Sequence, residues 1–330
     1  MLCFTSMKMV SSLGLVPLMI ALVASWSSTA VVHGQLKNGF YSSSCPKAEA
    51  IVRSAVESAF KDDPSIAPGL LRLHFHDCFV QGCDGSVLIS GSNAERSAPQ
   101  NLGIRGFEVI DAAKAQLEAS CPGVVSCADI LALAARDSVD LSNGPSWAVP
   151  TGRRDGRVSS ASQAAVLPSP LDSIAAQRQK FAAKGLDDHD LVTLAGNFPS
   201  TKISSVFWTS VTFCVQLAAT FTKLVDKTET LCPRNGNGLK KIPLDRDSHG
   251  NFDTSFFKNV KAGNGVLESD QRLWDDANTR RIVENYAGTI RGLFGFRFDF
   301  EFSKAMIKMS GVEVKTGRDG EIRKVCSRAN

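Results

Sequence analysis

The chain contains 330 residues, 43% of them hydrophobic, and has a formal net charge of +4 at pH 7. This length and composition allow a large buried core, in one large domain or two modest ones. No run of like charges marks an arm for nucleic acid or lipid, which argues against polyanionic partners. We therefore expect a globular protein with no nucleic-acid partner and no membrane anchor.

Residues 1–34 are typical of a secretion signal, with an apolar run over residues 13–23 followed by small side chains. A transmembrane helix is the alternative. However, Pro17 interrupts the run, which is shorter than the roughly 20 apolar residues that a span needs. We expect cleavage shortly before Gln35, a secreted extracellular protein and a mature domain over residues 35–330.

The chain has nine cysteines. Cleavage before Gln35 would remove Cys3 and leave eight, and an even number in a secreted chain favours disulfides over free thiols. Eight cysteines allow about 105 pairings, so their spacing alone does not assign the bonds.

Helical periodicity dominates the mature chain. Residues 47–60 and 107–119 carry apolar side chains at intervals of three and four, with charges between them. Residues 127–137 are almost entirely apolar, so we expect a helix that is buried on most faces. The remaining predicted helices cover 171–184, 279–287 and 302–309, and one more begins at His189.

Strand signals are sparse, and the best are short pieces near 148–150 and 320–323. We see no repeat at a fixed period, and no linker that would separate two domains. The sequence therefore predicts a mainly α fold, in a single compact helical domain with few short strands.

Residues 71–86, LRLHFHDCFVQGCDGS, hold the densest group of reactive side chains in the chain. Arg72 and His76 are four apart, so on a helix they share one face. Such a pair suits a reaction in which the histidine moves a proton between two oxygens while the guanidinium stabilises developing negative charge. The alternative is a surface arginine and a core histidine that have this spacing by chance.

The same stretch also predicts a loop around a hard cation. Carboxylate, hydroxyl and backbone carbonyl oxygens occur along it at short intervals, which is how loops bind calcium. Two cysteines five apart can close the loop with a short disulfide. The candidate ligands are Asp77, Val80, Gly82, Asp84 and Ser86, and the cysteines are Cys78 and Cys83.

His74, His76 and Asp77 suggest a transition-metal site as an alternative. The two histidines are two apart and diverge by about 200° on a helix, so one ion cannot easily take both. We therefore favour the proton-transfer interpretation for His76.

Long motifs make the chain similar to the secreted plant peroxidases, the class III haem peroxidases. Apart from one gap, the resemblance covers essentially the whole mature chain. Its motifs are LRLHFHDCFVQGCDGS, FYSSSCP (40–46), CPGVVSCADILALAARD (121–137), GRRDGR (152–157), LDRDSHGNFDTSFF (244–257), GVLESDQRLW (265–274) and TGRDGEIRKVC (316–326).

The resemblance implies a haem b cofactor and a distal site above it. It makes His76 the acid–base group and Arg72 the stabiliser of the transition state. Asn101 would accept the hydrogen bond that orients the histidine, with Glu95 linking its loop to the first calcium site. Pro168 matches the position at the entrance for phenolic reductants.

The resemblance also implies two calcium sites and a disulfide pattern. The first calcium site is the loop described above, and the second would use Asp245, Ser248, Asn251 and Asp253. The implied disulfides are Cys45–Cys121, Cys78–Cys83 and Cys127–Cys326, and Cys214 is the only candidate partner for Cys232.

The chain departs from the family where the proximal haem ligand is expected. The family has a histidine there, and this chain has Phe198, which has no lone pair for iron. His189 lies nine residues earlier, about 13 Å along a helix and rotated by about 180°, so it does not replace that ligand. The unfamiliar block runs over 197–231. Asp270 matches the carboxylate that would accept the ring N–H of the missing histidine.

These features predict a monomeric, secreted peroxidase that reduces hydrogen peroxide and oxidises phenolic donors, in the response to oxidative stress and in cell-wall chemistry. Two alternatives follow from Phe198 and the block around it. The chain is then a non-catalytic, peroxidase-like extracellular protein, or the product of an altered splice or reading frame.

Overall fold

The computed structural model describes residues 36–196, 202–204, 241–243, 245, 248, 252–288 and 295–330. The predicted signal segment lies outside these residues, as do Phe198, Asn251, Cys214 and Cys232. Most of the described chain is helical, which confirms the predicted mainly α class. Within the described ranges, no helix is both long and apolar enough to cross a bilayer.

The helices follow the predicted order. They are α2 (Ala48–Asp62), α3 (Ile66–Gln81), α4 (Phe107–Ser120), α5 (Cys127–Leu141), α6 (Ile174–Ala183), α7 (Asp188–Ala195), α10 (Ser255–Lys261), α11 (Glu268–Gln271), α12 (Ala277–Tyr286) and α13 (Gly295–Met309). Short 3-10 helices cover Ser86–Leu88, Glu95–Ser97, Pro99–Asn101, Ala161–Val166 and Arg272–Trp274.

Two helix starts show how local sequence sets the boundaries. Ser126 caps α5, because its side chain accepts a hydrogen bond from the backbone N–H of Asp129. Asp187 and Asp190 form a reciprocal capping box at the start of α7. Polar side chains thus satisfy backbone donors that the first helical turn would leave unpaired.

Helix α13 begins seven residues before the predicted 302–309 segment. Its added turns bury Phe298, four residues before the buried Phe302, and leave Phe300 67% exposed. The first turns of α13 therefore join the core through one face of the helix.

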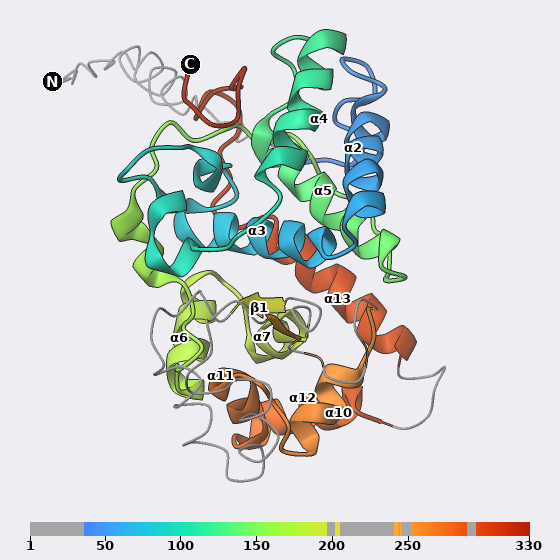
Figure 1. Ribbon diagram of the computed structural model, residues 1–330, viewed down its shortest axis with the longest axis vertical. Helices are drawn as coiled ribbons and strands as arrows, with labels where there is room; N and C mark the ends of the chain where they lie inside the picture. The colour runs from blue at the N-terminus through green and yellow to red at the C-terminus, as the bar shows by residue number, and fades with distance from the viewer. Residues whose placement is uncertain are drawn as a thin grey trace, which may run out of the picture. The chain divides into compact units, whose positions relative to one another are not determined.

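Helix α3 is buried along most of its length and packs against α5, while α2 packs on α4 and α5 (Figure 1). Helix α7 contacts α6, α12 and α13, and α10 contacts α12. Aromatic rings line the core beside α12 and α13, where Tyr286 lies 5.1 Å from Phe298 between ring centroids. The part of the reactive stretch that carries Arg72 and His76 therefore lies on a helix held by its neighbours rather than on a free loop.

The predicted strands near 148–150 and 320–323 are wrong. At or next to each piece the chain forms one isolated bridge instead of a strand, Lys37 with Thr151 and Asp155 with Glu321. Pro150 has no N–H to donate to a ladder, which limits the first piece. Among the described residues, the strands are β1 (Lys202–Ser204) and β2 (Lys241–Pro243), which pair antiparallel.

Among the described residues, three disulfides cross-link the chain, two of them between segments far apart in the sequence. They are Cys45–Cys121, Cys78–Cys83 and Cys127–Cys326, the same pairs that the resemblance implies. The last spans 199 residues and ties α5 to the C-terminal segment. In the chain-entropy model, a bond that closes so long a loop stabilises the fold by about 5 kcal/mol.

Candidate functional site

Arg72 and His76 lie on one face of α3, as their spacing predicts. Arg72 Nε donates a hydrogen bond to His76 Nε2 over 3.1 Å. The imidazole is 8% exposed, and Arg72 is half-buried. Their proximity is thus confirmed, and their chemical roles stay a prediction.

Asn101 holds the other ring nitrogen of His76. Its Oδ1 lies 2.6 Å from His76 Nδ1, and its own Nδ2 donates to the backbone carbonyl of Glu95 over 2.8 Å. Because the amide nitrogen is committed to Glu95, the oxygen must face the imidazole as an acceptor. These bonds assign the proton to Nδ1 and leave the Nε2 lone pair facing Arg72.

The charges of this pair follow from burial. Burial lowers the pKa of His76 to about 3, the positive charge of Arg72 adds to the effect, and the hydrogen bond to Asn101 opposes it. Burial also lowers the pKa of Arg72 to about 10. At neutral pH the site therefore combines a neutral imidazole that can accept a proton with a guanidinium that keeps its charge.

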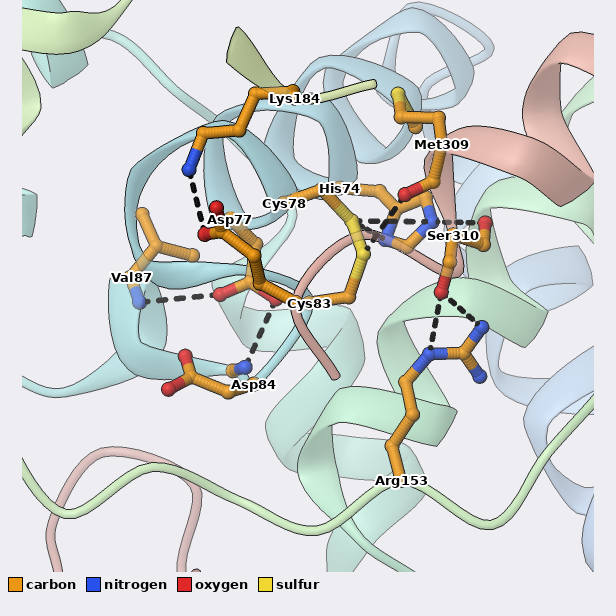
Figure 2. The surroundings of a disulfide bond; sticks show 12 residues. His74, Asp77, Cys78, Cys83, Asp84, Val87, Arg153, Lys184, Met309 and Ser310 are labelled. Carbon is orange, nitrogen blue, oxygen red and sulfur yellow. Dashed lines mark hydrogen bonds and ion pairs between the residues drawn. A yellow bond between two sulfur atoms is a disulfide. The ribbon is translucent and has the colours of Figure 1, made fainter. Parts of the chain in front are cut away.

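The predicted calcium loop follows α3 directly, and Cys78–Cys83 closes it (Figure 2). Asp77 accepts hydrogen bonds from the backbone N–H groups of Gly85, at 2.9 Å, and Val87, at 3.4 Å. Asp84 Oδ1 accepts one from the N–H of Ser86 at 3.0 Å. Gly82 ends the helix at a φ of +82°, a conformation that favours glycine.

The donors in this loop fit a cation. Asp77 and Asp84 are fully buried, and burial together with the charge of Asp84 holds the pKa of Asp77 well above its usual range. Burial likewise raises the pKa of Glu95 to about 7. Within the described chain, Ser86 Oγ and one carboxylate oxygen of Glu95 have no hydrogen-bond partner. Bound calcium would offset this concentrated negative charge.

Carboxylate side chains alone would not complete that site. In the described parts of the chain, no three His, Cys, Asp or Glu side chains are grouped closely enough to hold a metal ion. A calcium ion would therefore also need the Ser86 hydroxyl and the backbone carbonyls of Val80 and Gly82. The transition-metal alternative gains no support from the rings, since His74 Nε2 contacts Ser310 Oγ at 2.7 Å and His76 contacts Asn101.

At the second predicted calcium site, Asp245 and Asp253 are hydrogen-bonded to neighbouring residues of the chain. Both oxygens of Asp245 accept hydrogen bonds, one from Ser255 Oγ and one from Asn259 Nδ2 at 3.1 Å. Asp253 accepts from Ser248 Oγ at 2.5 Å and from the N–H of Ser255 at 2.7 Å. Sequence reasoning missed two of these partners, Ser255, the first residue of α10, and Asn259 on the same helix.

Hydrogen bonds connect the segment that carries Asp270 with the segment that carries Pro168. The N–H of Ser269 donates to the carbonyl of Pro170 over 2.9 Å. Gln177, which is 5% exposed, bridges the carbonyls of Ser269 and Asp172. The loop that carries Pro168 is thus fixed to α11, which carries Asp270.

The Peroxidase family model matches residues 52–289, which is most of the chain. This chain belongs to the peroxidase family. It is 63% identical to Peroxidase 25 of Arabidopsis thaliana over 300 residues, covering 89% of this chain and 92% of that one. It is 52% identical to Peroxidase N1 of Nicotiana tabacum, covering 94% and 96%, and 51% identical to Peroxidase 62 of Arabidopsis thaliana, covering 96% and 100%. A peroxidase is an oxidoreductase, and these relatives are plant proteins.

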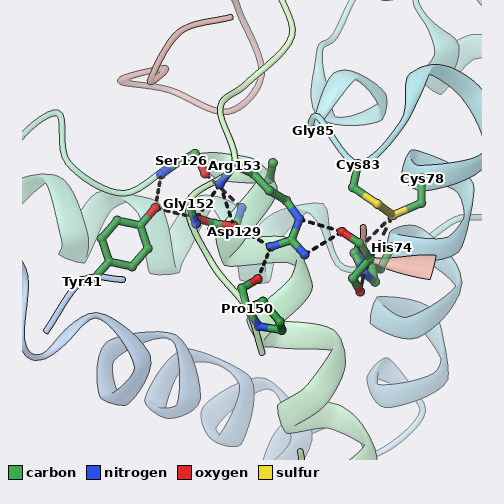
Figure 3. Close-up of polar contacts among 12 residues, drawn as sticks. Tyr41, His74, Cys78, Cys83, Gly85, Ser126, Asp129, Pro150, Gly152 and Arg153 are labelled. Atoms are coloured by element: carbon green, nitrogen blue, oxygen red, sulfur yellow. Dashed lines mark hydrogen bonds and ion pairs between the residues drawn. A yellow bond between two sulfur atoms is a disulfide. The ribbon is translucent and has the colours of Figure 1, made fainter. Parts of the chain in front are cut away.

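The peroxidase also contains a buried ionic network that sequence reasoning missed (Figure 3). Arg153 Nη1 lies 2.7 Å from Asp129 Oδ1, and both side chains are fully buried. Tyr41 donates its hydroxyl to Asp129 over 2.7 Å, and Arg153 donates to the carbonyl of Ser310 from two nitrogens. The network thus joins the segment before α2, helix α5 and the residue that follows α13. That residue, Ser310, also contacts His74 through its hydroxyl. Arg153 and Asp129 occur in the family motifs, but their spacing gives no sign of the contact.

Proposed function

We propose that this chain is a secreted, extracellular haem peroxidase that reduces hydrogen peroxide and oxidises phenolic donors in the plant cell wall. The network of Arg72, His76 and Asn101 carries the proposal, because it combines a neutral base, a fixed cation and an orienting amide at hydrogen-bond distances. Membership of the peroxidase family supports the same reaction.

In the proposed reaction, His76 Nε2 takes a proton from one oxygen of hydrogen peroxide and returns it to the other, which leaves as water. Arg72 stabilises the negative charge on the departing oxygen. Peroxide must first displace the Arg72 Nε–H from the His76 lone pair. Asn101 keeps the imidazole in the tautomer that this step needs. Bound haem would supply the electrons that cleave the peroxide bond.

Two further groups complete the proposal. Calcium would bind at Asp77, Asp84 and Ser86, at the end of the helix that carries His76. Phenolic donors would approach beside Pro168, whose loop is anchored by Lys180: its Nζ lies 2.9 Å from the Leu167 carbonyl and 2.7 Å from Asp172. The resemblance also supports monomeric secretion, with processing near Gln35.

A second function is favoured by one sequence observation. The distal residues fit a haem, but Phe198, which lies outside the described residues, stands where the family has its iron ligand. Burial raises the pKa of Asp270 to about 7, an effect that an imidazole N–H beside it would oppose. Such a chain would be a non-catalytic extracellular relative, or the product of an altered transcript.

One purified sample separates these functions. The secreted protein is reconstituted with haem, and its Soret absorption and guaiacol turnover are measured. A Soret band with turnover supports the enzyme, whereas a folded protein with neither supports the non-catalytic alternative. N-terminal sequencing should find a start near Gln35. Sequencing transcripts across codons 197–231 tests the splice alternative, which fails if this is the only sequence found.

The variant Phe198→His asks whether one side chain is the obstacle. If the surrounding chain can present a ligand to iron, the imidazole should raise haem affinity over that of the natural chain. Phe198→Leu is the matched control, since it changes the side chain without adding a lone pair. Equal haem binding by all three would place the obstacle in the wider block over 197–231.

A further inference from the structure

A lysine occupies one side of the predicted calcium loop. Lys315 Nζ lies 2.5 Å from Asp84 Oδ2. The Asp84 side chain is 1% exposed, whereas that of Lys315 is 32% exposed. Because Asp84 Oδ1 already accepts the N–H of Ser86, both oxygens of this proposed calcium ligand have a partner within the protein.

The backbone delivers Lys315 to this position. Its carbonyl accepts the N–H of Arg154 over 2.8 Å, in an isolated antiparallel bridge between the two residues. Two residues along, the N–H of Gly156 donates to the Asp84 carbonyl over 2.7 Å. A Cβ at Gly156 would collide with the Asp84 carboxylate, so glycine permits this close approach. The lysine therefore reaches Asp84 from a fixed segment rather than from a free loop.

We propose that Lys315 is an internal competitor for calcium, which neutralises Asp84 when the ion is absent and lowers the affinity of the loop for it. This inference rests on the proposed calcium site. An ammonium group and a calcium ion at one carboxylate repel each other, and loops tune calcium affinity through the charge around the ion. Binding calcium then requires the ammonium group to move away from Asp84.

The surroundings allow that movement for Lys315 but not for Arg323, a second cation at the loop. The flexible stem of Lys315 leads to solvent, where its charge is easily hydrated. Arg323 also reaches the loop, through Nη2 at 2.5 Å from the Gly85 carbonyl, but its side chain is fully buried beside Asp155. Arg323 is thus a constant charge in both states, and Lys315 is the one that can exchange with the ion.

The test compares Lys315→Met with the natural chain, by calcium titration against a competing chelator and by thermal unfolding in chelator. The variant should bind calcium about tenfold more tightly or better. Removing the positive charge that repels the ion needs to change the binding free energy only modestly to produce a tenfold difference in affinity. Its calcium-free form should melt at a lower temperature, because Asp84 has lost its internal cation. The difference in affinity should shrink at high salt, which screens the half-exposed ammonium.

Two control variants define the cause. Lys324→Met removes the same charge from an exposed position and should leave calcium affinity unchanged. Lys315→Arg keeps the charge and should stay within about threefold of the natural affinity. Equal or weaker calcium binding by a folded Lys315→Met would overturn the proposal and make the lysine a supporting partner of Asp84.

Failure of the calcium site itself has a different signature. Asp84→Asn should remove one equivalent of bound calcium from the natural chain. If a folded Asp84→Asn protein binds as much calcium and as tightly as the natural chain, then no calcium binds at Asp84 and the proposed site is wrong. If Asp84→Asn lowers calcium binding but Lys315→Met leaves it unchanged, the calcium site is supported and only the competing role of Lys315 is refuted.

Discussion

The proposed haem site has a histidine side, formed by Arg72, His76 and Asn101, and an aspartate side at Asp270. The two sides differ in the hydrogen-bond partners of their polar groups. His76 has a hydrogen-bond partner on each ring nitrogen, and that partner pattern fixes its tautomer. Asp270 is half-buried, and burial raises its pKa to about 7, while a backbone hydrogen bond at Leu267 acts in the opposite direction. The histidine side thus brings together the groups that the proposed reaction needs, whereas on the aspartate side we propose that Phe198 takes the position of the imidazole partner of Asp270.

The largest effect is expected from His76→Leu. The substitution removes the base of the proposed reaction, and general acid–base catalysis typically contributes about a hundredfold to ten-thousandfold in rate. The rate of the haem-loaded protein with hydrogen peroxide should fall by that factor, as measured by rapid mixing. Haem binding itself should change little, because the distal residue does not ligate iron in this proposal.

His189→Gln is the matched control on the other side. His189 Nε2 lies 3.3 Å from the Tyr286 hydroxyl, and its Nδ1 lies 3.5 Å from Thr193 Oγ1. These contacts give the residue a structural role at the start of α7. The variant should therefore keep the haem spectrum and the peroxide rate. Loss of the Soret band in this variant alone would show that His189 is the iron ligand after all.

Asn101→Ala should have a smaller effect on the same side. We expect a loss of about tenfold to a hundredfold, the range found when hydrogen-bond partners that orient metal-binding histidines are removed. Because the bond to Asn101 raises the pKa of His76, the variant should have a still weaker base. In the natural chain the peroxide rate should be flat from about pH 4 to pH 9, between the pKa values of His76 and Arg72. A variant with unchanged rate across this range would contradict the orienting role.

The sequence predicts contacts within α3 better than contacts across the fold. Arg72 and His76 are neighbours because any helix brings residues four apart together. Asn101 reaches His76 through two short 3-10 turns, whose geometry no residue spacing determines, so only the family resemblance identified it. Lys315 lies 231 residues from Asp84, and Ser255 bonds Asp245 from the start of another helix. Such contacts depend on packing between elements and leave no periodic signal.

The smallest effect is expected from Asp270→Asn, and it addresses the aspartate side directly. The folded pKa is raised, so the group favours folding at low pH and this contribution is lost as pH rises through about 7. Each pKa unit corresponds to about 1.4 kcal/mol, and partial exposure reduces the effect, so we expect the amide to stabilise the protein by about 1 kcal/mol more at pH 8 than at pH 5. Thermal unfolding at both pH values measures this difference, with the exposed Asp275→Asn as control.

In a Phe198→His background with haem bound, the gain should vanish, because an imidazole N–H would then favour the charged carboxylate. A constant difference between natural chain and variant at both pH values would mean that Asp270 is already paired, and the contrast with His76 would be lost.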